Sequence, residues 1–372
     1  MSAGLQNDRE RKRCHLAWHI TSRCNLACPH CLRRTPTQPA TDLPPEQCRM
    51  ILESFLQFAR ETDRDAEVEF SGGNPLLRED LPELLQTTGA AKKAGQVRNI
   101  RILGNPETLD DTTVQMLQAA AVDDFIVSVD GLEPVNDSMR GRGSFRAAMH
   151  GIRALVKSGI PTSVKFTLVR DNAHQVVDVF RLVMEEGVRH FGMGPLILAG
   201  GGWTERHRAL THMEYRQVLL DMLHFLDAAG SRFAAARRAF LAHNRLYALL
   251  FHELGRLDEY RALTGMNPGP FGMPQGRRNV LFVVWSDGEV VLRREMARQG
   301  RVPQQSFRDI YENSPMLHMF EDGSRIHELA KQHQKDSIRC SACPVAAYCL
   351  PAVVGTFGSQ LLFAPNRNCW RK

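Results

Sequence analysis

The sequence has no apolar run long enough to cross a membrane. A membrane-spanning helix needs about 20 mostly apolar residues, and no such run occurs in this chain. The chain also lacks the charged-then-apolar leader of a secretory signal peptide. Aromatic residues make up only 7% of it, and they do not alternate with basic residues as they do in proteins that stack nucleic-acid bases. These absences predict a cytoplasmic protein whose partners include neither membranes nor nucleic acids.

An extreme charge of either sign is also absent. The formal net charge of +6 is mild for 372 residues, and the hydrophobic share of 43% is enough for a large core. A chain of this length exceeds one ordinary domain and suits a barrel with an appendage. Basic residues do crowd the first 34 positions. This crowding is most simply a solvated charge run, and the alternative is a contact for an anionic peptide or nucleotide.

The nine cysteines are not expected to form disulfide bonds. In a reducing compartment, cysteines at close spacing argue for metal ligation instead. Seven of them fall into two clusters, and only Cys14 and Cys48 lie outside. These two are predicted to be buried apolar thiols.

The first cluster consists of Cys24, Cys28 and Cys31, spaced C-x3-C-x2-C directly after a predicted strand. Three thiolates hold three corners of a four-iron–four-sulfur cluster and leave the fourth iron open, whereas an electron-transfer cluster closes all four corners. The open corner indicates chemistry at the iron. The alternative is a zinc site that His30 or His19 completes as a fourth ligand.

The chain from residue 14 to about 200 alternates short apolar runs with amphipathic stretches, at the recurrence of a βαβ unit. This pattern predicts a parallel sheet covered by helices, either an open doubly wound sheet or part of a β/α barrel. Both place reactive groups at the carboxyl ends of the strands, where the cysteine loop lies. The predicted strands are 14–20, 66–70, 97–103, 124–129, 162–168 and 190–195. The predicted helices are 45–61, 79–94, 110–121, 144–158 and 175–186.

The loop sequence CNLACPHC, with His30 before the third cysteine, resembles the cluster loop of the radical S-adenosylmethionine (SAM) superfamily. The resemblance implies a partial (β/α)6 barrel in which Cys24, Cys28 and Cys31 hold a 4Fe-4S cluster. It also implies that SAM chelates the open iron and is cleaved reductively to methionine and a 5′-deoxyadenosyl radical.

The resemblance further implies contacts with SAM at the ends of other strands. In SGGNP, Gly72 and Gly73 let the backbone approach a ligand closely, and Asn74 stands where an acidic residue is common. Polar groups for the ribose or the amino-acid end of SAM are expected at the ends of the fourth to sixth strands. The alternatives are a plain turn at SGGNP and capping of strand ends elsewhere. The candidates at these later strands are Ser128, Asp130, Arg170 for the SAM carboxylate, and Gly192 beside adenine.

The rest of the chain is predicted to form a helical bridge followed by a separate cluster domain. The predicted organisation is a basic tail at 1–13, the barrel core at 14–203, a helical bridge with a Gly/Pro-rich linker at 204–277, and a C-terminal domain at 278–372. That last domain opens with a hairpin signal, in which NVLFVVW and EVVLR flank an Asp-Gly turn.

The second cysteine cluster resembles the SPASM extension of radical SAM enzymes that modify peptides. In this resemblance its four cysteines match the ligands of one auxiliary 4Fe-4S cluster. The cysteines that would bind a second auxiliary cluster are all absent. Arg293, Ala352 and Val353 stand where such cysteines are expected. Four thiolates suit zinc equally well, so zinc stays an alternative in this site. The four cysteines are Cys340, Cys343, Cys349 and Cys369.

Phrases such as RILGNPETLD and KFTLVRDN resemble peptide maturases of the selenobiotic or thio(seleno)oxazole type. The resemblance implies an oxidoreductase that abstracts hydrogen from a ribosomally made precursor peptide. Its expected partners are that peptide, a flavodoxin or ferredoxin as reductant, and a separate leader-binding protein. The alternatives are a maturase of tetrapyrroles or small cofactors, and a zinc-stabilised binding protein without activity. The sequence nominates no general base.

Overall fold

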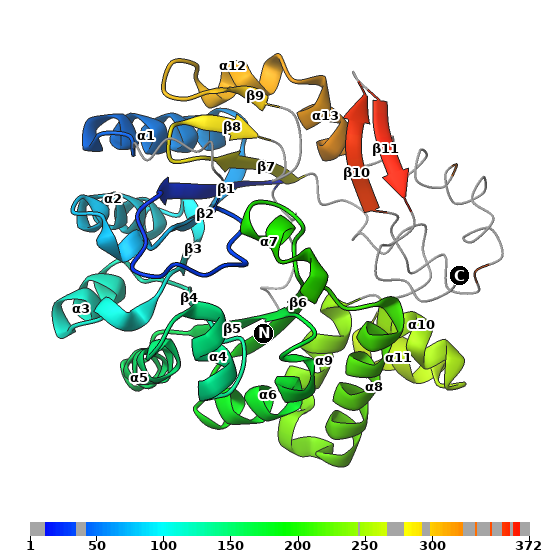
Figure 1. The fold of residues 1–372 in the computed structure, drawn as a ribbon. Helices are drawn as coiled ribbons and strands as arrows, with labels where there is room; N and C mark the ends of the chain where they lie inside the picture. The colour runs from blue at the N-terminus through cyan, green and yellow to red at the C-terminus, as the bar shows by residue number, and fades with distance from the viewer. Residues whose placement is uncertain are drawn as a thin grey trace, which may run out of the picture.

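The computed structural model describes residues 12–34, 42–244, 246–265, 279–291 and 298–322, the single residues Gln332 and Cys343, and two short strands at 352–357 and 360–364. Its centre is a nine-stranded sheet in the order β6-β5-β4-β3-β2-β1-β7-β8-β9. Figure 1 shows this sheet curving, with helices covering its outer face.

The first six strands are parallel to one another, as the sequence predicts. Three of them have the predicted bounds, and the first two are longer at both ends. The predicted partial barrel is therefore confirmed. The strands are β1 (Lys12–Thr21), β2 (Arg64–Gly72), β3 (Val97–Leu103), β4 (Asp124–Ser128), β5 (Thr162–Leu168) and β6 (His190–Pro195).

Alternation along the strands separates the apolar core from a polar barrel interior. On β1, Leu16, Trp18 and Ile20 are buried in the hydrophobic core. Arg13 and His19 point the other way and line cavities inside the barrel. Successive side chains of a strand point to opposite faces, so one sequence serves both sides.

The covering helices follow the strands in βα order. Most of them bury apolar residues in the hydrophobic core, which is where the stability of an amphipathic helix comes from. The helices are α1 (Pro45–Glu61), α2 (Leu81–Lys93), α3 (Asp111–Ala119), α4 (Glu133–Arg140), α5 (Ser144–Lys157) and α6 (Val176–Glu185).

A group of helices follows β6, and most of it lies in the lower right of Figure 1. Five phenylalanines join this group to α6 and β6, with ring centroids 5.4–6.3 Å apart. They are Phe180, Phe191, Phe225, Phe233 and Phe240. The helices are α7 (Gly201–Thr204), α8 (His212–Ala228), α9 (Ala234–His243), α10 (Leu246–Glu253) and α11 (Leu257–Thr264).

The start of the predicted C-terminal domain continues the barrel sheet. β7 (Asn279–Val284) pairs in parallel with β1, and the expected hairpin to β8 (Glu289–Val291) is present. β9 (Arg298–Arg301) is the last strand of this sheet, and α12 (Phe307–Glu312) and α13 (Pro315–Asp322) follow. Phe282 of β7 lies 4.8 Å from Phe307 and 5.3 Å from Phe58 of α1, measured between ring centroids. Aromatic packing therefore fixes β7 to the barrel.

The final strands, β10 (Ala352–Phe357) and β11 (Gln360–Ala364), form a separate antiparallel pair. Of the four C-terminal cysteines, only Cys343 is described, and it packs partly buried against the core. The auxiliary cluster stays a prediction, because Cys340, Cys349 and Cys369 lie outside the described residues.

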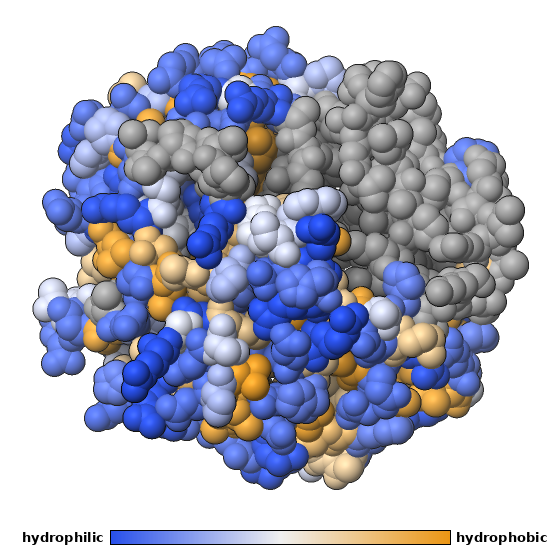
Figure 2. Space-filling model, in the orientation of Figure 1, coloured by the Kyte–Doolittle hydropathy of each residue, from blue (hydrophilic) through white to orange (hydrophobic). Residues whose placement is uncertain are grey.

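The visible surface is mainly polar. Figure 2 shows a largely hydrophilic face with apolar side chains in small separate patches. None of the helices in the described parts of the chain combines the length and apolar character that crossing a membrane requires.

Candidate active site

A cavity of about 470 Å³ opens at the carboxyl ends of the parallel strands. Residues from β1 to β6 and the loop after β1 line it. This end of the sheet is where β/α folds assemble ligand sites, because the loops that follow the strands converge there. The three cysteines of the first cluster all line this cavity.

Backbone hydrogen bonds and one carboxylate shape the cysteine loop. Asp42 accepts hydrogen bonds from Thr21 Oγ1 at 2.5 Å and from the backbone N–H of Ser22 at 2.7 Å, at the point where the chain leaves β1. The Cys31 N–H donates to the Cys28 carbonyl at 3.1 Å, which forms a tight turn. Cys24 is exposed, Cys28 is buried, and all three cysteines are free thiols.

The three thiols fit an iron–sulfur cluster better than a single ion. They face one cavity, and the charges of Cys24 and Cys31 reach Cys28. The two histidines that could complete a zinc site have other neighbours, because His30 lies 3.3 Å from Asp130 and His19 lies 2.9 Å from the Ser71 hydroxyl. A cluster binds each cysteine through a different iron atom, whereas zinc needs all its ligands at one point. The residues present therefore fit the cluster.

Glycines on two other segments hold this loop in place. A Cβ on Gly73 would lie 2.0 Å from the Arg23 carbonyl oxygen, so only glycine fits there. A Cβ on Gly201 would lie 2.1 Å from the Pro29 carbonyl oxygen, and the Gly201 N–H donates to the Cys31 carbonyl at 2.9 Å. The sequence identified Gly200–Gly202 only as the end of the repeating region. Their role depends on a contact that spans most of the barrel.

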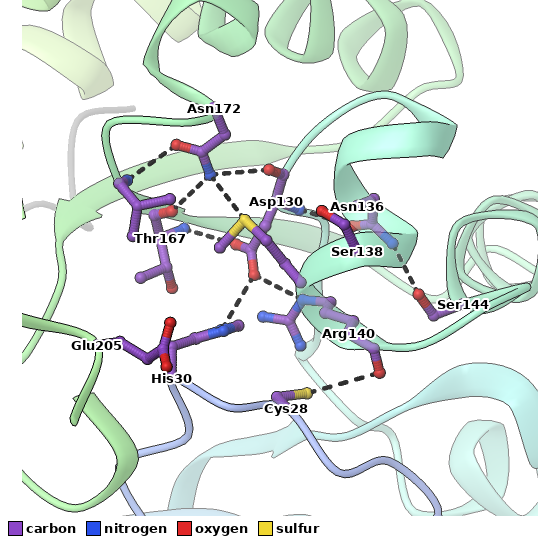
Figure 3. Close-up of polar contacts among 12 residues, drawn as sticks. Cys28, His30, Asp130, Asn136, Ser138, Arg140, Ser144, Thr167, Asn172 and Glu205 are labelled. Atoms are coloured by element: carbon purple, nitrogen blue, oxygen red, sulfur yellow. Dashed lines mark hydrogen bonds and ion pairs between the residues drawn. The ribbon is translucent and has the colours of Figure 1, made fainter. Parts of the chain in front are cut away.

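Asp130 is the hub of a buried network beside the cysteines (Figure 3). Its carboxylate accepts hydrogen bonds from Arg140 Nε at 2.7 Å and from the Thr167 N–H at 2.7 Å. His30 Nε2 lies 3.3 Å from the same carboxylate. Asn172 donates to the Asp130 carbonyl at 2.8 Å. The Asp130 side chain therefore ties the cysteine loop to α4 and β5, and its backbone carbonyl ties it to the loop before α6.

The charges of this network reach the cysteines. Burial alone would raise the pKa of Asp130, but Arg140 and His30 outweigh it, and the pKa is lowered. Burial raises the pKa of Cys28, and the nearby Arg140 opposes that rise. The Cys28 thiol also lies 3.9 Å from the Arg140 carbonyl. Arg140 is thus a fixed positive charge beside the thiols.

Arg140 is the main site residue that the sequence analysis missed. Its guanidinium lines the cavity, and only Nε is used by Asp130. Among the described residues, no acceptor is recorded for its two terminal nitrogens. It ends α4, a helix that the strand-and-helix pattern did not predict. The signal that was available is the short amphipathic stretch directly after VSVDG.

Most of the predicted ligand contacts do line the cavity. Gly72, Gly73, Ser128, Gly192 and His30 all contribute to its wall.

Asn74 and Asp130 lie behind the wall of the cavity. Both are fully buried and neither lines the cavity. The Asn74 amide donates to the Asn25 side chain at 3.1 Å and to the Asn105 carbonyl at 3.2 Å. These two residues hold the loops behind the wall through contacts within the protein, and their contacts with SAM stay predictions.

Arg170 lies away from the cavity wall, and its contact with SAM stays a prediction. Its guanidinium donates to Glu214 at 3.0 Å and to the carbonyls of His207 and Ala209 at 3.1 and 3.2 Å. It is not among the residues that line the cavity. Arg170 ties the end of β5 to the segment before α8, because the chain turns outward after Leu168.

Trp285, at the end of β7, supports the cavity wall from the C-terminal segment. Its ring lies 4.8 Å from the His19 ring and 5.0 Å from the guanidinium of Arg33, measured to ring centroids. Both partners line the cavity. His19 Nδ1 is also 2.9 Å from the Ser71 hydroxyl. The sequence assigned Trp285 to a hairpin and gave no reason to place it here.

Sequence comparisons with known proteins are consistent with this site. Residues 18–183 match the Radical SAM superfamily. The chain is 29% identical over 206 residues to Fe-coproporphyrin III synthase of Methanosarcina barkeri, covering 55% of this chain and 49% of that protein. It is 30% identical over 222 residues to the mycofactocin maturase MftC of Mycolicibacterium smegmatis, covering 58% and 52%. The chain therefore spans about half the length of the curated relatives it matches.

The fold extends beyond the matched segment. The structure of Streptococcus suis SuiB bound to its precursor peptide SuiA superposes with a TM-score of 0.61 at 14% identity, covering 92% of this chain and 72% of SuiB. SuiB bound to S-adenosylmethionine superposes with a TM-score of 0.59 at 13% identity, covering 92% and 73%. At this identity the likeness concerns the fold. The cysteine motif and the partial barrel agree with the match of residues 18–183 to the Radical SAM superfamily.

Proposed function

We propose that this protein is a radical SAM enzyme that modifies a ribosomally made precursor peptide. The observation that carries the proposal is the set of three free thiols, Cys24, Cys28 and Cys31, at one cavity over the carboxyl ends of a partial barrel. This cavity combines a cluster-binding loop with space for a nucleoside.

Different residues around the cavity would bind the cluster and the different parts of SAM. The three cysteines would hold a 4Fe-4S cluster, which together with SAM supplies one-electron reductive cleavage of the sulfonium. Arg140 offers two free guanidinium nitrogens for the carboxylate of SAM, since planar donors bind carboxylates in pairs. Ser128 offers a hydroxyl, and the backbone at Gly72 and Gly73 can approach the amino-acid end closely.

A peptide is the proposed substrate. SuiB, whose fold this chain shares over most of its length, is bound to a precursor peptide, and MftC is a maturase. The proposal extends to one auxiliary cluster on Cys340, Cys343, Cys349 and Cys369. It also extends to a flavodoxin or ferredoxin as reductant and to a separate leader-binding protein.

The experiment is anaerobic co-expression with the short reading frame beside this gene, followed by mass spectrometry of that peptide. A mass change with the wild-type protein, abolished by Cys28→Ala while the peptide persists, is the expected result. Reconstituted protein should bind about eight irons per chain if both clusters form, and about four in the Cys28→Ala variant. Zinc in both sites and no cleavage of SAM would overturn the proposal.

Tetrapyrrole maturation is the second candidate, because Fe-coproporphyrin III synthase is among the similar relatives. The two candidates differ in their substrates. Incubating the reconstituted protein with SAM, a reductant and an iron coproporphyrin would change the tetrapyrrole's mass under this alternative. Under the peptide proposal the tetrapyrrole should stay unchanged.

A further inference from the structure

A second cavity, of about 850 Å³, lies within the barrel and reaches the helices beside β6. Strand residues from β1 to β6 line one side, and Tyr215, Ala236 and Asn244 of the α8–α9 region line the other. Its volume is within the range of about 300–1,000 Å³ that is usual for ligand sites. In a closed β/α barrel this space is packed with branched apolar side chains. Here it is open and polar.

The two cavities adjoin each other. Lys165, Gly192 and Met193 line both of them. Gly192 adds no side chain at this junction, and an added Cβ would come no closer than 4.0 Å to another residue. A molecule in the second cavity can therefore extend to the site proposed for SAM.

The acidic groups of the second cavity are nearly all neutralised within the protein. Glu67 pairs with Arg13 at 3.3 Å and with Arg101 at 3.1 Å, so it holds both arginines.

The two aspartates of the wall are engaged as well. Asp123 pairs with Lys92 at 2.6 Å, and Asp124 accepts a hydrogen bond from Ser163 at 2.7 Å. The remaining bases are Lys165, His190 and Arg189. Lys165 and His190 have partners, and the charges of Arg189 and His190 act on Asp124.

Glu69 is the exception. Among the described residues, none donates a hydrogen bond to its carboxylate or forms an ion pair with it. Arg101 lies directly opposite Glu69 in the β2–β3 register but pairs with Glu67 instead. His15 interacts electrostatically with Glu69 but does not neutralise it, since burial lowers the pKa of His15. A half-buried carboxylate without a partner favours a cation strongly.

We propose that the second cavity binds a lysine or arginine side chain of the precursor peptide, whose cation pairs with Glu69. This inference rests on the proposed function, because it specifies the substrate of the same site. It places the peptide along the barrel interior, with the cation at β2 and the neighbouring peptide at the junction by Gly192.

The test measures binding rather than turnover. Protein loaded with cluster and SAM is titrated with three synthetic peptides, acetyl-Gly-Gly-Xaa-Gly-Gly-amide, where Xaa is lysine, norleucine or glutamate. Ligand-observed NMR gives the dissociation constants. The lysine peptide should bind the wild-type protein about tenfold more tightly than the norleucine peptide, as expected for a charge-assisted pair away from bulk water. Glu69→Gln should abolish this preference.

Asp124→Asn is the matched control, because the amide oxygen still accepts the Ser163 hydrogen bond. It removes a carboxylate from the same wall and should keep the lysine preference. Equal binding of the lysine and norleucine peptides to the wild-type protein would overturn the inference, as would a preference that survives Glu69→Gln. Cleavage of SAM by the wild-type protein without peptide is measured in parallel. Intact cleavage without a lysine preference refutes this inference alone, whereas a lysine preference without cleavage refutes the proposed function alone.

Discussion

At the scale of single residues, the contacts of an arginine decide whether its charge faces the cavity, and its place in a sequence motif does not. Arg170 and Arg140 are both basic residues near the ends of parallel strands. The first is consumed by Glu214 and two backbone carbonyls, and the second keeps part of its guanidinium in the cavity. The hydrogen bond to Asp130 orients Arg140, whose guanidinium lines the cavity.

Replacing Arg140 therefore tests the site more directly than replacing Arg170. We expect Arg140→Gln to weaken SAM binding by about tenfold to a hundredfold, because a charge-assisted contact with the carboxylate is lost. Equilibrium dialysis of SAM against the reconstituted protein measures this effect. Arg170→Gln is the control and should leave SAM affinity within about twofold, since its partners lie outside the cavity. If the two variants weakened SAM binding equally, the assignment of Arg140 would be wrong.

The sequence predicted those parts of the site that depend on local spacing. Cys24, Cys28 and Cys31 lie in one short loop, so their spacing in the sequence was enough to predict that they act together. The short apolar runs likewise predicted the first and last residues of β3, β5 and β6 correctly. Arg140, Gly201 and Trp285 were missed because each meets the site through a contact with a distant segment. Periodicity does not report which distant segments meet.

At the scale of elements, the short helix α7 acts as a clamp on the cysteine loop. Gly200 and Gly201 approach the carbonyls of Leu32 and Pro29 more closely than any side chain allows. The Gly201 N–H then fixes the Cys31 carbonyl. The position of one cluster ligand thus depends on a segment that follows the last barrel strand.

We expect Gly201→Ala to lower cluster incorporation at the first site. The added Cβ would overlap the Pro29 carbonyl and displace the loop between Cys28 and Cys31. Iron and sulfide analysis after anaerobic reconstitution should show a loss of about four irons per chain. Gly265→Ala is the control. The positive φ of 66° strains an alanine there, but nothing lies within 4 Å of its Cβ position, so this variant strains the backbone without overlapping the cysteine loop. Full iron content in Gly201→Ala would contradict the clamp.

At the scale of the whole molecule, a buried ion pair joins β2 to α13, two elements far apart in the sequence. Arg64 of β2 lies 2.5 Å from Glu321 of α13, and both side chains are nearly inaccessible. Tyr311 also donates to Glu321. Burial would raise the pKa of Glu321, but the bonds from Tyr311 and Arg64 outweigh it and lower the pKa. Burial, with the help of Glu321, raises the pKa of Tyr311 to about 12.

Removing Glu321 should destabilise the protein, because it leaves Arg64 charged and buried. We expect Glu321→Gln to lower the free energy of unfolding by about 3 kcal/mol. Glu312→Gln breaks the exposed pair with Arg308 and should cost less than about 1 kcal/mol. Urea unfolding followed by circular dichroism compares the two variants. Equal losses would show that the buried pair contributes no more than a surface pair.

Because of the same ion pair, the free energy of unfolding should decrease at acidic pH. The pKa of Glu321 is lowered from its ordinary value of 4.5, so the unfolded chain binds the proton more readily. The contribution is fully present above pH 4.5 and is lost as the pH falls through the lower, folded value. In urea unfolding between pH 6 and pH 3, the difference between the wild-type protein and Glu321→Gln should shrink toward the acid end. A constant difference across this range would contradict the assignment.

The parallel pairing of β7 with β1 has a consequence for biosynthesis. The first strand to leave the ribosome gains one of its two neighbours only after Val284 has been translated. Until then β1 presents an open hydrogen-bonding edge, which is a template for intermolecular pairing. Nascent chains stalled after residue 265 should therefore aggregate more readily than chains released after residue 322, even though both contain every cysteine of the first cluster.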